Sequence, residues 1–484
     1  MSAANPTPTP INPDDPGQAM QAILQAQRDA FHRELPVEIG ARADRLDRGI
    51  DLLTRHQDEL TAAMSEDFGH RPELLSKFVD VVSSVNAMKH AKAHLKKWMR
   101  RERRKVRFPL NLLGARAWLE FQPLGVIGII SPWNFPVNLT FSPLASALAA
   151  GNRCMIKPSE YTPKTAEVMR QLVDEYFSAE EVWVVTGGRE VGQAFSQLAF
   201  DHLLFTGSTE VGRHIMRAAA DNLTPVTLEL GGKSPAILGR DVDLQRAARR
   251  IVIGKMMNAG QVCLAPDYVL VPEGRRDAFV AAMRTSAEAL YPTAHGNEDY
   301  TMIVDQRQAD RLAGYLRELD GSDTEILPLQ DLGDDASDRR MPLTLVIDPP
   351  EDVALMREEI FGPILPVKSY GTIDEAIDYV NSRSRPLALY YFGDDTEERD
   401  RVLGRTISGG VTLDDVVFHV AVEDLPFGGI GASGIGAYHG QDGFRRFSHA
   451  KAVFKQPKLD VTGLIGAVPP YGDRLKRLMD WDLR

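Results

Sequence analysis

Two side chains in this sequence combine a reactive type with suggestive surroundings, Cys263 in NAGQVCLAPDYVL and Glu229 in TLELGGKSP. A thiolate attacks an electrophilic carbon, and a carboxylate can remove the proton that a nucleophile or a water must lose. A single cysteine is usually a small buried hydrophobe, and a single glutamate is usually solvated. Here, however, Glu229 ends an apolar run before two glycines, and Cys263 lies among Gly, Gln and Ala residues. We therefore expect the chain to place a nucleophile and a general base against one reactive carbon.

The composition is that of an ordinary globular protein, with 43% hydrophobic and 25% charged residues. A length of 484 residues suggests roughly two to three domains. The formal net charge of −11 argues against nucleic acid or an anionic membrane as the main partner. Two cysteines, Cys154 and Cys263, cannot form a disulfide framework, and no secretory signal is evident, so we expect a cytoplasmic protein. No run approaches the roughly 18 apolar residues that span a bilayer, so no membrane anchor is expected at the C-terminal MDWDLR either.

The pattern of apolar residues predicts an α/β fold. Residues 1–16 are rich in Pro, Asn and Thr and are expected to form a flexible leader, and helical spacing follows from 17 to about 98. Short β-rich runs then alternate with amphipathic helices to residue 230, which indicates βαβ units on a parallel sheet. In the helix expected at 162–177, Thr162 is predicted to cap the N-terminus. After residue 233 the alternation restarts, with long helices near 243–257 and 275–290, and implies a second α/β domain. The expected strands are GVIGIIS, RCMIKPS, VWVVTG, HLLFTG and PVTLEL in the first domain and PAIL, YVLV, LTLVID, ILPVKS, ALYYFG and GGVTL in the second.

A phosphate-binding turn is expected in FTGSTEVGRHIM, where Gly207 and Ser208 join a strand to a helix and Gly212 lies one turn in. Backbone N–H groups at such a helix start favour phosphate, which fits a dinucleotide. This spacing is GxxxxG. A GxGxxG occurs at 429–434, but it lacks a preceding strand and a following helix, so no cofactor is expected there. GGKS at 231–234 lacks the earlier glycine of a P-loop, which leaves an ATPase as a weak alternative.

One segment, residues 89–107, is strongly basic. A patch for polyanions is one interpretation, but solvated helix faces often have this composition and the rest of the chain is acidic, so we expect no nucleic-acid partner. His90 and His94 are spaced i, i+4 and could hold zinc. The glutamate of an HExxH site is absent and lysines surround both rings, so we predict no metal site.

The two reactive residues also carry a family resemblance. The motifs LELGGKSP and GQVCLA resemble the paired signature of the aldehyde dehydrogenase superfamily, with Cys263 34 residues after Glu229. The resemblance extends from about residue 20 to about 455. It implies that Cys263 attacks an aldehyde, that hydride leaves the resulting thiohemiacetal, and that Glu229 activates water to hydrolyse the thioester. Asn134 in SPWNFP would donate its side-chain amide to the oxyanion, together with the Cys263 N–H. A structural or binding protein using the fold without catalysis is the alternative from another class.

The resemblance also implies a cofactor, NAD with NADP as a possibility. Lys157 and Glu160 in IKPSEYTP match residues that contact the adenosine ribose in the family, and a carboxylate at the ribose diol favours NAD on charge grounds. In EEIFGP, Glu359 would hold the nicotinamide ribose and Phe361 would lean on the nicotinamide ring.

The ending LPFGGIGASGIGAYHG resembles the class 3 branch, which includes fatty-aldehyde and coniferyl-aldehyde dehydrogenases, because Gly431 stands where the commoner form has Lys. FDHLLFTGST and TPVTLELGGKSP are most similar to the coniferyl-aldehyde enzymes. An aromatic aldehyde of the coniferyl type is therefore expected as substrate, with medium- or long-chain fatty aldehydes as the alternative. Phe135, Asn138 and Leu139 are expected to line the substrate pocket, and the VVFHV stretch at 416–420 is expected near it.

On this resemblance the fold comprises two doubly wound, Rossmann-like parallel-sheet domains and a small β element for oligomerisation. A homodimer is expected to pair through residues 101–120 and the strand KAVFKQP. The expected boundaries are a leader at 1–16, an NAD(P)-binding domain at 17–100 and 124–231, a catalytic domain at 232–427, an oligomerisation element at 101–123 and 428–460, and a C-terminal tail at 461–484.

Overall fold

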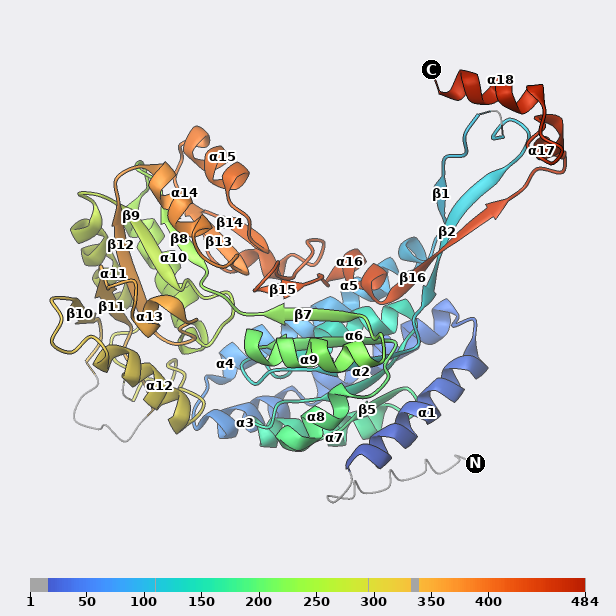
Figure 1. Ribbon diagram of the computed structural model, residues 1–484. Coiled ribbons are helices and arrows are strands. Elements are labelled where there is room, and N and C mark those ends of the chain that lie inside the picture. Colours follow the sequence, from blue (N-terminus) through green and yellow to red (C-terminus); the bar gives the residue numbers. More distant parts are fainter. Residues whose placement is uncertain (1–15, 109, 295, 332–338, 484) are drawn as a thin grey trace.

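The computed structural model describes residues 16–108, 110–294, 296–331 and 339–483. The leader expected at 1–16 therefore lies outside the described residues except for Pro16. In these described residues the strands form three separate sheets, of six, seven and three strands, and helices lie between them in the chain, which confirms the α/β class (Figure 1). Within the described ranges, no helix is both long and apolar enough to cross a membrane.

The six-stranded sheet contains the strands expected in the first half of the chain. Neighbouring strands in this sheet are parallel, except that the short edge strand β15 pairs antiparallel with β7. Strands β3 and β4 are buried at every position, as expected for a parallel sheet with helices on both faces. The order is β15 (Gly434–Ile435), β7 (Val226–Leu230), β6 (His202–Gly207), β3 (Val126–Ile130), β4 (Arg153–Lys157) and β5 (Val182–Val184).

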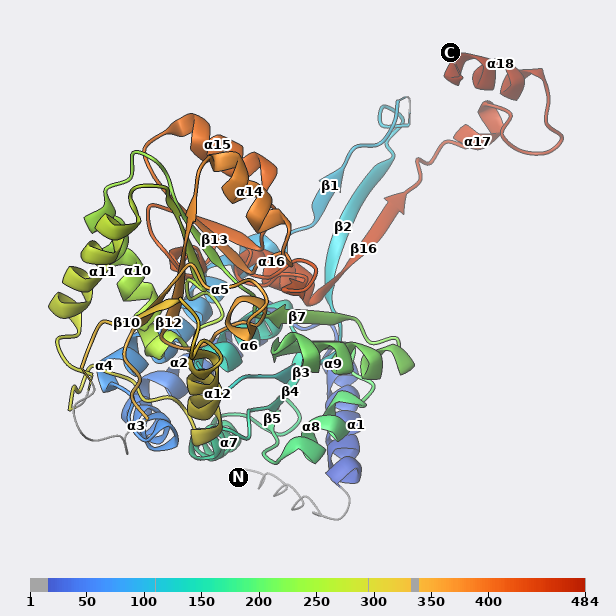
Figure 2. The same ribbon diagram turned by 60° about the vertical axis from the view of Figure 1, so that its left-hand side comes forward.

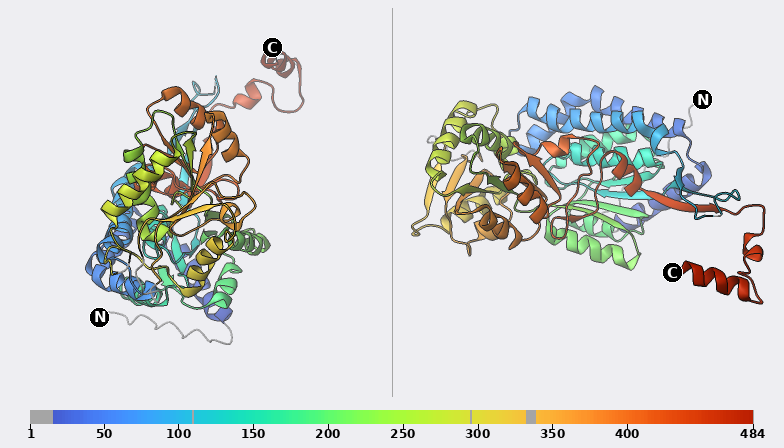
Figure 3. Two further views of the ribbon diagram at one scale, coloured as in Figure 1. Left: turned by 90° about the vertical axis from the view of Figure 1, so that its left-hand side faces the viewer. Right: turned by 90° about the horizontal axis from the view of Figure 1, so that it is seen from above.

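Alternate residues of β3 belong to two different apolar clusters, one on each face of this sheet. Ile127 and Ile129 pack with residues of α2, α5 and α6, whereas Val126 and Ile130 pack with residues of α1, α8 and α9. The two helix layers are visible on opposite sides of the sheet in the right-hand view of Figure 3. The helices of this half are α1 (Pro16–Glu34), α2 (Ile39–Arg55), α3 (Gln57–Phe68), α4 (Glu73–Ser76), the π-helix η1 (Lys77–Val82), α5 (Ser83–Trp98), α6 (Asn138–Ala150), α7 (Pro163–Tyr176), α8 (Arg189–Ser196) and α9 (Thr209–Asp221).

The seven-stranded sheet holds the strands expected after residue 233, with the edge strand β10 antiparallel and the other pairs parallel. The expected helix near 243–257 is α10, and the Asp243 side chain caps it by accepting from the Arg246 N–H. Its strand order is β10 (Glu325–Pro328), β11 (Thr344–Ile347), β12 (Ile364–Tyr370), β9 (Tyr268–Pro272), β8 (Pro235–Leu238), β13 (Ala388–Phe392) and β14 (Gly410–Leu413). Its helices are α10 (Leu244–Met256), the 3-10 turn η2 (Met257–Gly260), α11 (Arg276–Leu290), α12 (Gln306–Arg317), α13 (Ala354–Arg357), α14 (Ile373–Asn381) and α15 (Thr396–Arg405).

The three-stranded sheet forms an arm that projects from the body of the molecule (Figure 2). In it β2 (Arg116–Pro123) lies between β1 (Glu102–Arg104) and β16 (Ser448–Lys455), and both pairings are antiparallel. The chain reaches β16 through the 3-10 turn η3 (Phe418–Ala421), β15 and α16 (Gly440–Arg446), and continues into α17 (Val461–Leu464) and α18 (Asp473–Asp482). The edge strand β16 is largely exposed on this arm.

The predicted cap of α7 is wrong. The Thr162 side chain makes no capping hydrogen bond. Instead the carboxylate of Asp67, at the end of α3, accepts from the Lys164 N–H at 3.0 Å and the Thr165 N–H at 2.8 Å. A carboxylate at a helix N-terminus satisfies free N–H groups and also interacts favourably with the helix dipole, so the cap comes from a neighbouring helix.

Candidate active site

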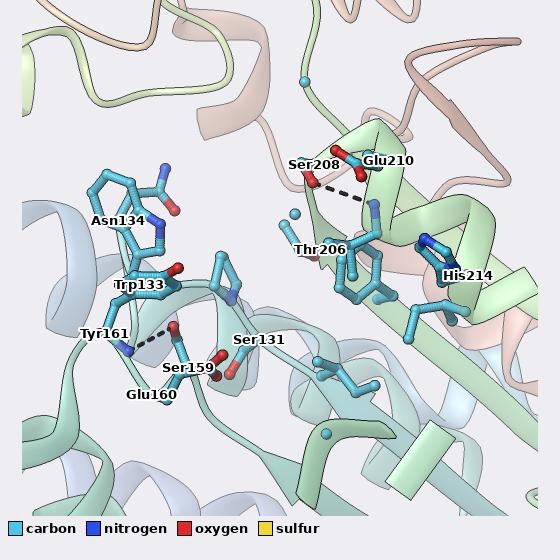
Figure 4. A pocket seen from close by; sticks show the side chains of 18 of the residues that line it. Ser131, Trp133, Asn134, Ser159, Glu160, Tyr161, Thr206, Ser208, Glu210 and His214 are labelled. Atoms are coloured by element: carbon cyan, nitrogen blue, oxygen red, sulfur yellow. Dashed lines mark hydrogen bonds between the residues drawn. The ribbon is translucent and has the colours of Figure 1, made fainter. Parts of the chain in front are cut away.

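A cavity of about 940 Å³ opens at the carboxyl ends of β3, β4 and β6. Ligands of doubly wound sheets bind at this edge because the loops and helix N-termini face it. Figure 4 shows the loop after β3, with Trp133 and Asn134, facing the start of α9, with Ser208 and Glu210. Cys263 and Glu229 line the same cavity, so the nucleophile and the base expected from the sequence lie together.

Most of the site residues expected from the sequence line this cavity. They are Asn134, Leu139, Lys157, Glu160, Gly207, Ser208, Glu229, Cys263, Glu359 and Phe361. Gly212, Phe135 and Asn138 are not part of its lining. Phe135 is buried with the Arg71 guanidinium 5.1 Å above its ring, and Asn138 accepts a hydrogen bond from Ser142 at 2.6 Å.

Glu229 is a buried carboxyl group with 1% of its surface exposed. Burial raises its pKa to about 8, and contact with the Cys263 thiol partly opposes this rise. Burial and the nearby carboxylates Glu229 and Glu359 raise the pKa of Cys263 well above its ordinary value. The thiol is therefore protonated at rest, and a thiolate forms when a base removes the proton. Glu229 is adjacent and has a pKa suited to that transfer near neutral pH.

The loop before Cys263 has an unusual backbone that Asn134 and Gln261 hold in place. Asn258, Ala259 and Gly260 all have positive φ, at 49°, 52° and 75°. The Asn134 amide donates to the Gln261 carbonyl at 3.1 Å, and the Gln261 side chain bonds Asn258, Met302 and Val304. A Cβ atom at Gly260 would overlap the Gly362 carbonyl, so only glycine fits this close approach.

The far end of the cavity has groups suited to a dinucleotide. Lys157 donates to Glu160 at 2.6 Å, with Lys157 nearly buried and Glu160 partly exposed. Ser208 caps α9 by accepting from the Val211 N–H, which leaves other N–H groups of this helix start available for phosphate. Glu359 has one buried carboxyl oxygen that no described residue pairs, and burial raises its pKa to about 8. A ribose hydroxyl would satisfy this oxygen, so the residues fit the expected cofactor.

Several residues on the cavity were not found from the sequence. Trp133 packs edge-on against Phe361 at 5.3 Å, and its position beside Asn134 was a signal that could have been used. Arg189 on α8 and Arg307 on α12 lie in helices without a motif, and tertiary packing brings them to the cavity. Lys255 on α10 does not line the cavity; it is fully buried, its amine is paired by no described residue, and burial lowers its pKa to about 8.

The family described as "Aldehyde dehydrogenase family" matches residues 11–453. The chain is 52% identical over 476 residues to a probable coniferyl aldehyde dehydrogenase of Caulobacter vibrioides, covering 98% of each chain. It is 45% identical over 482 residues to the coniferyl aldehyde dehydrogenase of a Pseudomonas species, covering 99% of this chain and 98% of the other.

Solved structures share the fold as well. Staphylococcus aureus AldH, described in a substrate-bound state, superimposes with a TM-score of 0.89 at 34% identity, covering 96% of this chain and 99% of that one. A Mycobacterium tuberculosis aldehyde dehydrogenase complexed with NAD⁺ superimposes with a TM-score of 0.82 at 29% identity, covering 92% of both chains.

Proposed function

The chain belongs to the aldehyde dehydrogenase family, and from this premise we propose that it oxidises a coniferyl-type aromatic aldehyde to the carboxylic acid with NAD or NADP. One observation carries the proposal: a thiol, a buried carboxyl group and a side-chain amide line one cavity together with groups suited to a dinucleotide. This arrangement supplies a nucleophile, a base and an oxyanion donor for one carbonyl carbon.

In the first half of the reaction, Glu229 takes the proton of the Cys263 thiol and the thiolate adds to the aldehyde carbon. The Asn134 amide donates one N–H to the Gln261 carbonyl, which fixes the amide. No described residue accepts its second N–H, so this N–H can bind the developing oxyanion together with the Cys263 N–H. When bound, the nicotinamide cofactor supplies the hydride acceptor. Loss of hydride from the thiohemiacetal leaves a thioester on Cys263.

Before the second half, Glu229 releases the thiol proton to solvent; it then removes a proton from water as the water oxygen adds to the thioester carbon. Collapse of the tetrahedral intermediate releases the acid and expels the Cys263 thiolate, which takes the proton from Glu229 and becomes the resting thiol again. A single carboxyl group serves both halves, which suits a group whose pKa of about 8 lets it accept and release a proton near neutral pH.

For the cofactor, we assign the ribose of the adenosine to Lys157 and Glu160, the phosphates to the start of α9 at Gly207 and Ser208, and the nicotinamide side to Glu359 and Phe361. The six-stranded sheet would thus carry the cofactor and the seven-stranded sheet the nucleophile. The carboxylate of Glu160 favours NAD, since it accepts from ribose hydroxyls and repels a 2′-phosphate.

The aromatic substrate is supported by the two relatives named as coniferyl aldehyde dehydrogenases, which match almost the whole chain. Leu139 on the cavity wall beside Asn134 offers apolar surface to an extended substrate. Burial of such surface stabilises a large planar aldehyde by about 25 cal/mol per Å², whereas acetaldehyde has little surface to bury.

The experiment is a comparison of NADH formation with coniferaldehyde, a medium-chain aliphatic aldehyde and acetaldehyde, each with NAD and NADP. Catalytic efficiency should rise steeply from acetaldehyde to coniferaldehyde. Equal efficiencies would exclude the aromatic assignment. A preference for the aliphatic aldehyde would favour a fatty-aldehyde enzyme. No reduction of NAD or NADP with any aldehyde would exclude the proposed catalysis itself.

We also propose a homodimer that pairs through the arm. The exposed edge of β16 has free backbone groups that a strand of a second copy can pair, and its Phe454 side chain is exposed.

A further inference from the structure

A buried ion pair between Arg71 and Asp80 lies beside the loop that carries Asn134. The Arg71 guanidinium donates to the Asp80 carboxylate at 2.7 Å, and both side chains are fully buried. Neither residue is among the described residues that line the cavity. Removing two charges from water costs about as much free energy as their attraction returns, so such a pair is a weak source of stability. Its contacts with the neighbouring loop therefore indicate its role.

Asp80 caps the helix α6, which follows that loop. The N-cap residue of α6 is Val137, which has no polar side chain to accept from the free N–H groups of the first turn. Instead one carboxyl oxygen of Asp80, in η1, accepts from the Val137 N–H at 3.2 Å and the Asn138 N–H at 3.0 Å. A carboxylate at this end of a helix is also favoured by the helix dipole. Asp80 thus fixes the backbone three and four residues after Asn134.

Arg71 contacts the aromatic side chains around the same loop. Its guanidinium lies 5.1 Å from the centre of the Phe135 ring and 5.2 Å from that of Phe68. The Phe68 ring lies in turn 6.2 Å from the ring of Trp133. A cation is attracted to the face of an aromatic ring, most strongly where water is excluded. Arg71 therefore restrains one neighbour of Asn134 directly and the other through Phe68.

Asn134 itself is buried, and the bonds that hold it come from the opposite side of the cavity. Its amide donates to the Gln261 carbonyl at 3.1 Å, and its backbone carbonyl accepts from the Asn258 amide at 3.1 Å. Both partners belong to the loop of Cys263. An oxyanion donor is effective only when its N–H is already in place as charge develops. The loop after β3 therefore needs an anchor in its own half of the molecule.

We propose that the Arg71–Asp80 pair positions the oxyanion donor, because it anchors the loop after β3 on both sides of Asn134. This role depends on the proposed function of Asn134 in attack on the aldehyde. The pair lies off the cavity and acts only through that residue, so Arg71 and Asp80 are positioning residues. The pair links η1 to the start of α6, and the geometry of the amide is set by that link.

Two uncharged variants of the pair separate the cap from the charges. In Arg71→Met/Asp80→Asn, the new side chain at position 80 keeps an oxygen that can accept from the N–H groups of Val137 and Asn138. In Arg71→Met/Asp80→Leu, this acceptor is lost. Neither variant leaves a buried charge without its partner, which is the usual reason that breaking such a pair unfolds a protein.

Stopped-flow absorbance of NADH, with coniferaldehyde and saturating NAD, measures the first turnover of each variant. Arg71→Met/Asp80→Leu should slow it roughly tenfold to 100-fold, since a small misplacement of a catalytic group has a cost of this order. Arg71→Met/Asp80→Asn should lose less. The Michaelis constant for the aldehyde and the NAD affinity by calorimetry should change little. Melting temperatures verify that each variant is folded in the assay.

Arg45→Met is the matched control, because Arg45 is also a buried arginine and pairs with Glu34 at 2.7 Å and Glu181 at 3.0 Å. None of these three residues is among those that line the cavity. This variant should have a lower melting temperature and an unchanged first turnover. A loss of rate in Arg45→Met equal to that in Arg71→Met/Asp80→Leu would show that the rate follows general stability, and would overturn the positioning role.

The decisive measurement repeats the substitutions in Asn134→Ala. There Arg71→Met/Asp80→Leu should cost less than roughly twofold in the first turnover, because the pair acts through an amide that is already absent. The same loss with and without Asn134, or no loss in either background, would overturn the positioning role while leaving the dehydrogenase intact. If the Asp80→Leu variant does not fold, Asp80→Asn alone enters the same cycle. A wild-type protein that forms no NADH with any aldehyde would overturn the proposed function as well.

Discussion

The side-chain amide of Asn134 donates to the backbone carbonyl of Gln261 across 3.1 Å, and so ties the loop after β3 to the loop that ends at Cys263. The two loops come from different sheets, and this hydrogen bond sets the position of the amide relative to the nucleophile. Asn258 strengthens the connection, because its amide donates to the Asn134 carbonyl at 3.1 Å.

Asn134→Ala should lower kcat by roughly 100-fold to 1,000-fold, the usual cost of removing one oxyanion donor. The loss should fall on acylation, so the burst of NADH should slow as much as the steady state. Asn222→Ala is the matched control, since Asn222 bonds the Gln197 carbonyl on an exposed surface. A variant that retains full kcat would exclude Asn134 from the oxyanion site.

Cys263→Ala should abolish aldehyde-dependent NADH formation and leave NAD binding, measured by calorimetry, nearly unchanged. The groups assigned to the cofactor belong mainly to the other sheet and do not need the thiol. Cys154→Ala should retain activity, because Cys154 is buried in β4 away from the cavity. Residual dehydrogenation in Cys263→Ala would exclude the covalent mechanism.

Activity should rise with pH through about 8, because Glu229 must be ionised to accept a proton and its pKa is about 8. The unfolded chain binds this proton with the ordinary pKa of 4.5, so the folded state holds it more tightly. The contribution of Glu229 to the free energy of unfolding should therefore fall as the pH rises from about 4.5 to about 8. Glu229→Gln should lack this pH-dependent loss of stability. Melting temperatures of both proteins across this range provide the check, and parallel profiles would contradict it.

Glu160→Gln should raise the Michaelis constant for NAD roughly tenfold, because hydrogen bonds to charged groups contribute about 1.5 kcal/mol or more. The constant for the aldehyde should change much less. Glu167→Gln on α7 removes an acid that pairs with Arg170 and does not line the cavity, so it serves as the control. An unchanged constant for NAD in Glu160→Gln would remove Glu160 from the cofactor site.

Light scattering at micromolar concentration should give twice the chain mass of 53.6 kDa. Phe454→Asp on β16 should shift the protein towards monomer, because a charge on the paired edge opposes strand association. Leu74→Asp replaces a leucine of α4, also highly exposed, and should leave the mass unchanged. A wild-type monomer would exclude the proposed dimer.

The strands of both large sheets could be predicted because each is a short apolar run, and runs such as 126–130 are buried on both faces. The cap of α7 could not, because Asp67 reaches that helix only through tertiary packing. The same limit applies to the cavity. Motifs identified residues on the loops after strands, whereas Arg307 comes from a helix whose sequence shows only amphipathic spacing.

Phe135 illustrates a different limit. Its place beside Asn134 suggested a substrate contact, but adjacent residues in this loop of bends and turns point in different directions. The ring is buried under Arg71, which in turn forms a fully buried ion pair with Asp80 at 2.7 Å. Sequence position alone could not distinguish the two orientations.

The contact between Gly260 and Gly362 has a mechanical consequence. The two backbones approach closely there, and no side chain between them can change its conformation. The loop of Cys263 and the loop of Glu359 and Phe361 must therefore shift together. Any displacement of the loop of Glu359 and Phe361 would be transmitted to the sulfur of Cys263. The thiol that we propose as the nucleophile is thus in register with the residues that we propose for the nicotinamide before either reactant enters.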